Sequence, residues 1–137
     1  MDILFVSSVA VVSADPSASR KLFVEALGLP LEPHPGSDYY SSEKVAGTRH
    51  FGVWPLAEAA RACFGTTAWP ANRTVPQSSI EFEVASAELV EAGAQELAAK
   101  GHALLHPTRE EPWGQTVARV LSPEGVIVGI SYAPWMH

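Results

Sequence analysis

The sequence contains little of what marks several large classes of protein. Its one cysteine, Cys63, excludes an internal disulfide and a cysteine-cluster metal site. It has 9 Lys and Arg against 15 Asp and Glu, and a formal net charge of -6. Nucleic acids and anionic membrane surfaces are bound through clustered Lys and Arg, so this balance argues against both as partners. No apolar run reaches the roughly 20 residues that a membrane-spanning helix needs.

The chain also lacks the short motifs that identify common enzyme classes. It has no G-x-S-x-G, no P-loop and no G-x-G-x-x-G, so nothing favours a hydrolase, a phosphate-binding loop or a dinucleotide site. The first residues, Met1-Asp2-Ile3-Leu4, have no basic region before the apolar ones, and we read them as the start of a strand rather than a signal peptide. Together with the single cysteine, this predicts a cytoplasmic protein.

Apolar residues are plentiful. They make up 47% of the 137 residues, against 18% charged, which suffices for one packed domain over residues 1–137. Four of them are tryptophans.

The chain repeats one order of elements twice. A β-rich run over residues 3–12 leads to Asp15-Pro16, an N-cap followed by Pro, and then to an expected helix over residues 17–27 that ends at Gly28. Residues 79–84 alternate polar and apolar, and Ser86 caps an expected helix over residues 87–100 that ends at Gly101. In the first helix, Leu22, Phe23, Ala26 and Leu27 are expected to face inward.

Short strand candidates follow each helix. They span residues 31–34, 39–45 and 48–54 in the first half, and residues 103–105, 116–121 and 126–132 in the second. The sequence therefore predicts an α+β fold of two β-α-β-β-β modules, about 1–54 and 77–137, joined by a short helix and linker over residues 55–76. Two such modules, each covered by a helix on one face, form a curved-sheet cup that can hold a ligand.

The order and spacing of these elements resemble the vicinal-oxygen-chelate superfamily, which includes glyoxalase I, bleomycin-resistance proteins and extradiol dioxygenases. The matching stretches are residues 8–28, residues 79–101, and the closing run Pro112-Trp113-Gly114 with Ser122-Pro123-Glu124-Gly125. The resemblance implies a glyoxalase/bleomycin-resistance-like fold and a homodimer. One fold of this kind hosts several functions, so the resemblance by itself does not choose among them.

Metal-using members of this superfamily hold Zn, Ni, Mn or Fe with His, Gln or Glu side chains. The resemblance places the four ligand positions at Ser8, Phe51, Ser79 and Gly129. Serine is a poor ligand for these metals, and Phe and Gly offer no donor, so we expect no metal or other cofactor. A one-residue slip of register would bring His50 to the position of Phe51. His50 and Glu81 are therefore the metal candidates of the alternative hypothesis.

Two kinds of side chain are candidates for binding a ligand in the cup. Glu81 and Glu83 share a strand face with Ser79, where a carboxylate is a general base, a ligand anchor or simply a partner for Arg49 or Arg119. Trp54 and Trp113 are expected to stack on a planar guest, whereas Trp69 and Trp135 are read as packing residues. The full predicted ligand site is Ser8, Phe51, Trp54, Ser79, Glu81, Trp113, Arg119 and Gly129, the last leaving room for a guest.

These observations support three hypotheses. The first is a metal-independent protein of the bleomycin-resistance type that sequesters an aromatic metabolite or antibiotic. The second is a glyoxalase-type lyase or isomerase, or a dioxygenase, with a displaced metal site or with metal-free acid–base catalysis by Glu81. The third is a partner-binding domain with an empty cup.

Overall fold

Both halves of the chain form the module that the repeat predicts. In the computed structural model, which describes residues 1–137, the first module contains β1 (Phe5–Ser13), α1 (Pro16–Arg20), η1 (Lys21–Ala26), β2 (Glu32–Pro33), β3 (Tyr40–Ser42) and β4 (Phe51–Pro55). After the connecting helix α2 (Leu56–Phe64), the second contains β5 (Ser78–Glu83), α3 (Ala87–Ala99), β6 (Arg109–Glu110), β7 (Thr116–Leu121) and β8 (Ile127–Tyr132). A 3-10 turn, η2 (Pro134–Met136), ends the chain. The predicted α+β fold of two repeated modules is confirmed.

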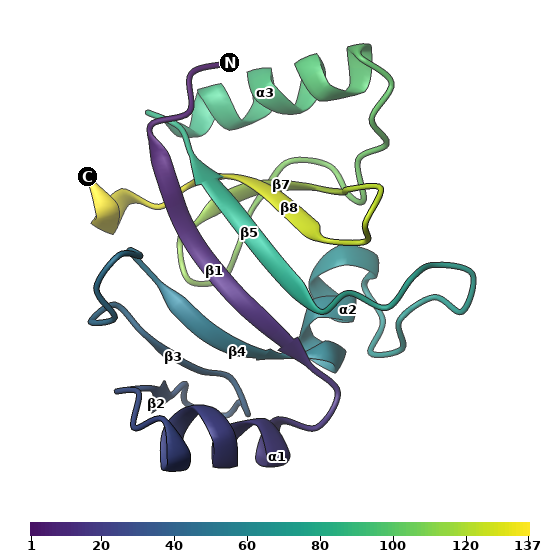
Figure 1. Ribbon diagram of the computed structural model, residues 1–137. Helices are drawn as coiled ribbons and strands as arrows, with labels where there is room; N and C mark the ends of the chain where they lie inside the picture. Colours follow the sequence, from purple (N-terminus) through teal and green to yellow (C-terminus); the bar gives the residue numbers. More distant parts are fainter.

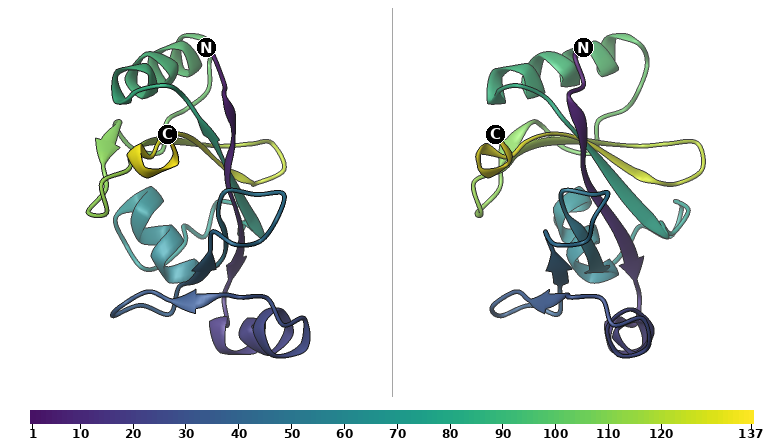
Figure 2. Two further views of the ribbon diagram at one scale, coloured as in Figure 1. Left: turned by 90° about the vertical axis from the view of Figure 1, so that its left-hand side faces the viewer. Right: turned by 60° about the vertical axis from the view of Figure 1, so that its left-hand side comes forward.

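The two modules share one eight-stranded sheet in the order β2-β3-β4-β1-β5-β8-β7-β6 (Figure 1). Its centre is the antiparallel pair β1 and β5, in which Ser8 lies opposite Glu81. β1 is parallel to β4 and β5 is parallel to β8, so the modules are related by the symmetry of the repeat. Figure 2 shows that the sheet is strongly curved, with α1 and α3 at opposite ends of the molecule.

Two apolar clusters hold this sheet. Under α3, Val84, Val90, Ala94, Ala118 and Ile130 are buried together. Under α2, Val12, Ala59, Cys63 and Ile127 form the second cluster. Burial raises the pKa of the Cys63 thiol to about 11, so this cysteine packs as a neutral apolar group rather than serving as a nucleophile.

The first helix differs from its prediction. Asp15 caps it as expected, accepting a hydrogen bond from the Ala18 N–H at 3.1 Å. From Lys21 onward, however, the backbone winds as a π-helix, and the Leu27 N–H reaches back five residues to the Leu22 carbonyl. The wider turn changes which residues share a face. Leu22 and Leu27, expected to be buried, are 53% and 59% exposed.

The prediction of a strand over residues 103–105 is also wrong. The edge strand β6 lies at Arg109–Glu110 and pairs with β7. Leu105 still donates its N–H to the Arg119 carbonyl at 2.9 Å, but Pro107 has no N–H with which to extend that ladder. No helix in the structure combines the length and apolar character that crossing a bilayer would require.

A glycine in β4 makes room for an aromatic ring that reaches across the sheet. A Cβ built on Gly52 would lie 2.6 Å from both Cε2 and the hydroxyl oxygen of Tyr39. Gly52 itself has ordinary strand geometry, so space rather than backbone conformation requires glycine here.

We therefore expect Gly52→Ala to lower the free energy of unfolding by about 1–3 kcal/mol, the usual cost of overpacking. Urea unfolding of the variant measures this cost. In a Tyr39→Ala background the same substitution should cost much less, because the clashing ring is gone. Equal costs in the two backgrounds would show that the ring is not the obstacle.

Candidate functional site

The concave side of the sheet encloses a cavity of about 630 Å³ between the two modules. This volume lies within the range of small-molecule sites. Its wall is built from β1, β4, β5, β7 and β8, from α2, from residues 111–115 and from η2. Six of the eight predicted ligand-binding residues line it, namely Ser8, Trp54, Ser79, Glu81, Trp113 and Arg119.

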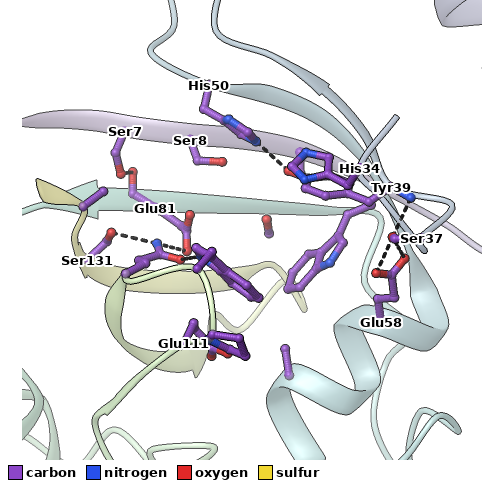
Figure 3. A pocket seen from close by; sticks show the side chains of 18 of the residues that line it. Ser7, Ser8, His34, Ser37, Tyr39, His50, Glu58, Glu81, Glu111 and Ser131 are labelled. Carbon is purple, nitrogen blue, oxygen red and sulfur yellow. Dashed lines mark hydrogen bonds between the residues drawn. The ribbon is translucent and has the colours of Figure 1, made fainter. Parts of the chain in front are cut away.

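Glu81 lies on the cavity wall in β5. Its Oε2 accepts a hydrogen bond from Gln115 Nε2 at 3.1 Å, and no hydrogen bond within the chain occupies Oε1 (Figure 3). Burial raises the pKa of this carboxyl above its ordinary value, and the positive charge of Arg119 and the bond from Gln115 offset part of the increase. The site therefore presents this oxygen of Glu81 to whatever enters the cavity.

Gln115 holds this carboxyl in place. Its Nε2 also donates to Ser131 Oγ at 2.8 Å, and its Oε1 accepts from Trp113 Nε1 at 2.9 Å. Both amide N–H groups and the amide oxygen thus have partners, which determine the orientation of the side chain. The indole of Trp113 and the carboxyl of Glu81 are linked through this one amide.

Arg119 lines the cavity but is already paired. Its Nη1 lies 3.0 Å from Glu111 Oε1 and 3.2 Å from His106 Nε2. Both Glu111 and His106 are buried. Burial lowers the pKa of His106, whose Nδ1 lies 2.7 Å from the Pro107 carbonyl oxygen. A neutral His106 can therefore donate from Nδ1 and accept from Arg119 at Nε2. Arg119 acts on the site through its charge near Glu81 rather than as a free ligand-binding group.

A second polar group lies on the opposite wall, on the segments before β3 and β4. The Tyr39 hydroxyl is 2.6 Å from His50 Nε2, and the Tyr39 ring stacks on His34 at 4.6 Å between centroids. Burial raises the pKa of the Tyr39 phenol and lowers that of His50, so both are neutral near pH 7. Figure 3 shows these rings across the cavity from Glu81.

Phe51 does not reach the cavity, and its prediction as a ligand-binding residue is wrong. It pairs with Val9 across β1 and packs against Phe23 of the first helix, 6.1 Å between ring centroids. Its neighbour His50 lines the cavity instead. Adjacent strand residues point to opposite faces of the sheet. A one-residue difference of register therefore places His50, rather than Phe51, on the cavity face.

Gly129 makes room for a different group from the one predicted. A Cβ built on it would lie 3.0 Å from Glu81 Cγ and 3.2 Å from Glu81 Oε2. In the sheet Glu81 pairs with Gly129, so the carboxyl of β5 occupies the volume that a β8 side chain would fill. The space left by glycine is thus taken by the protein itself and not by a guest.

Glu83 was expected to face the cup with Glu81, but the C-terminal segment covers it. Glu83 is fully buried, and its Oε2 accepts hydrogen bonds from the Ala133 N–H and from His137 Nε2. Arg49, the other partner considered for these carboxylates, lies over the ring of Phe5 instead.

The residues at the superfamily's ligand positions do not fit a transition metal. Ser8 and Ser79 offer only hydroxyls, Gly129 has no side chain, and Phe51 faces the helix. The alternative donors are also engaged or separated, since His50 Nε2 is bonded to Tyr39 and no cluster of three His, Cys, Asp or Glu side chains has metal-binding geometry. No step that depends on a metal is therefore derived for this site.

The tryptophans that line the cavity are not only the two that the sequence predicts. Trp54 and Trp113 line the cavity as expected, and so does Trp135, which was read as a packing residue. Trp69 packs edge-on against Phe64, and its Nε1 donates to the Thr74 carbonyl at 3.0 Å. Sequence reasoning missed Tyr39, Gln115 and Glu111 as site residues. Glu111 and Gln115 directly flank Pro112-Trp113-Gly114, a run that carried the resemblance, but nothing in the sequence placed Tyr39 in the cavity.

Comparisons with solved structures give the fold its class. No family model matches the sequence, and no curated protein matches it significantly. A glyoxalase/bleomycin resistance protein/dioxygenase superfamily member from Vibrio splendidus superposes with a TM-score of 0.57 and 18% identity over 93% of this chain and 97% of its own. A Streptomyces coelicolor methylmalonyl-CoA epimerase variant in complex with 2-nitronate-propionyl-CoA superposes with a TM-score of 0.59 and 14% identity over 97% of this chain and 96% of its own.

An NAD-dependent benzaldehyde dehydrogenase from Legionella pneumophila gives a TM-score of 0.60 and 14% identity over 90% of this chain and 96% of its own. The chain has the vicinal-oxygen-chelate fold, as its sequence pattern predicted. At these identities the likeness extends to the fold and not to an activity.

The raised pKa of Glu81 predicts how the free energy of unfolding depends on pH. The folded state binds this proton more tightly than the unfolded chain, so the folded state loses stability as pH rises above about 4.5, until the raised pKa is passed. Glu81→Gln removes this titration. We expect the free energy of unfolding of the wild type to fall, relative to that of the variant, as pH rises from about 4.5 toward the raised pKa.

Urea unfolding across that range measures the difference, and Glu110→Gln, at an exposed carboxylate, is the matched control. A flat difference for Glu81→Gln would contradict a raised pKa.

Proposed function

We propose that this protein binds a small aromatic molecule in its cavity without the help of a metal. The observation that carries the proposal is the composition of the cavity wall. It combines three indole side chains, from Trp54, Trp113 and Trp135, with a carboxyl oxygen of Glu81 that has no partner within the chain. Aromatic walls with a few placed polar groups are typical of sites for planar ligands.

Binding without turnover is favoured by the state of the other polar groups. Arg119, Glu111 and Gln115 bond to other residues of the protein, so they shape the cavity rather than react in it. This arrangement supports a sequestering role of the bleomycin-resistance type, acting on an aromatic metabolite or antibiotic. The expected homodimer and the cytoplasmic location belong to the same proposal.

A second function is favoured by one specific feature of Glu81. Its carboxyl has an oxygen without a partner, and burial raises the pKa of this same carboxyl. Such a group is suited to removing a proton from a bound substrate near neutral pH. In that case the protein would be a glyoxalase-type lyase or isomerase, with Glu81 as its base. A dioxygenase would instead need a metal at a displaced site.

The stacking role of Trp113 can be tested with naphthylmethanol, a neutral bicyclic probe. We expect Trp113→Ala to weaken its binding about fivefold, because one aromatic stack contributes on the order of 1 kcal/mol. Isothermal titration calorimetry measures this without relying on indole fluorescence. Trp69→Phe, outside the cavity, should leave the affinity unchanged. Failure of the wild type to bind, or an unchanged affinity in Trp113→Ala, would contradict the proposal.

Metal content separates the metal-independent functions from a metal-dependent enzyme. We expect elemental analysis of protein purified without chelators or a metal-binding tag to find no stoichiometric transition metal, even after incubation with Zn, Ni, Mn and Fe. The physical reason is that the four ligand positions supply no strong donor. About one metal per chain would contradict this and make a metal-dependent enzyme the better reading.

A further inference from the structure

Three oxygen atoms on the floor of the cavity have no partner in the protein. They are Ser8 Oγ, Ser79 Oγ and Glu81 Oε1, all of which line the cavity. Ser8 and Ser79 are only 6% and 5% exposed, yet no hydrogen bond within the chain occupies either hydroxyl. Ser7, by contrast, donates to the Glu81 carbonyl at 3.1 Å. These three oxygens open onto the cavity rather than into the packed interior, so they are available to accept hydrogen bonds from a ligand there.

The sheet brings these three oxygens together. Ser8 lies directly opposite Glu81 across the β1–β5 pair, and Ser79 lies two residues before Glu81 on the same face of β5. Directly opposite residues have Cβ atoms about 5 Å apart, and same-face neighbours along a strand are about 7 Å apart. Three side chains at that spacing can converge on one atom of a guest.

The chemistry of the floor selects for a group that donates hydrogen bonds and carries positive charge. Two hydroxyls and a carboxylate can all accept, and a protonated primary amine has three N–H donors to offer. An anionic ligand would meet the charge of Glu81. Arg119, whose charge acts on Glu81, is itself paired with Glu111. The indole faces of the wall can contact either a cation or the aromatic ring attached to it.

We propose that Ser8, Ser79 and Glu81 form an ammonium subsite, so that the ligand of this cavity is an aromatic primary amine bound through its protonated nitrogen. This inference rests on the proposed function and specifies its ligand class. The ring lies among the tryptophans, and the ammonium group contacts the three oxygens at the floor.

The test compares two probes that share a ring, naphthylmethylamine and naphthylmethanol, by calorimetry near neutral pH. Charge-assisted hydrogen bonds in a buried site are stronger than neutral ones, so the amine should bind at least about tenfold more tightly than the alcohol. Glu81→Gln should remove most of this preference, and Ser79→Ala should reduce it. Ser78→Ala, on the opposite face of β5, and Glu110→Gln, at an exposed site, are the matched controls and should preserve it.

A third probe, the N,N,N-trimethyl derivative of the amine, keeps the charge but has no N–H group. It should bind more weakly than the amine. Equal binding would overturn the three-oxygen subsite in favour of recognition by the indole faces alone.

Equal binding of amine and alcohol, or a preference that survives Glu81→Gln, would overturn the inference and leave the proposed function standing. Failure of both probes to bind would overturn both.

Discussion

The antiparallel pairing of β1 with β5 is the constraint on which the rest of the structure depends. It joins two modules, neither of which encloses a cavity alone, into one curved sheet. It also decides which residues meet, because its register sets Ser8 opposite Glu81 and Ala10 opposite Ser79. A slip of one residue would carry these side chains to the helix-covered face. The floor of the cavity is thus a property of the pairing and not of either strand.

Two neighbouring strands share the space around the acid of the cavity. The last strand has a glycine, Gly129, where the superfamily resemblance places a ligand position. The adjacent strand supplies Glu81, whose carboxyl fills the volume next to this glycine. An acid therefore lies in the cavity, held by the amide of Gln115.

Buried polar contacts around the cavity maintain its shape. Removing charges from water is costly unless they are paired, and Arg119 meets this requirement through Glu111 and His106. Glu111 also anchors the loop that carries Trp113, because its backbone exchanges hydrogen bonds with residues 114 and 115. On the other wall, the space at Gly52 lets Tyr39 reach His50. Each wall is held by contacts between residues that are distant in the sequence or in different strands.

The sequence by itself determined the elements and their order, because caps, glycine stops and strand alternation are local signals. The Asp15 cap and the strand over residues 116–121 follow from such signals, whereas Ser86 stands at the start of its helix without a side-chain capping bond. The alternation of residues 79–84 put Ser79 and Glu81 on one strand face, and the resemblance added Ser8 and Trp113 to the cup. Only the tertiary structure decided that Phe51 faces a helix, that Glu81 occupies the space beside Gly129, and that Tyr39 and Trp135 reach the cavity. These outcomes depend on strand register, on the π-helical turn and on loop packing, which arise from contacts between segments far apart in the chain and leave no periodic mark in the sequence.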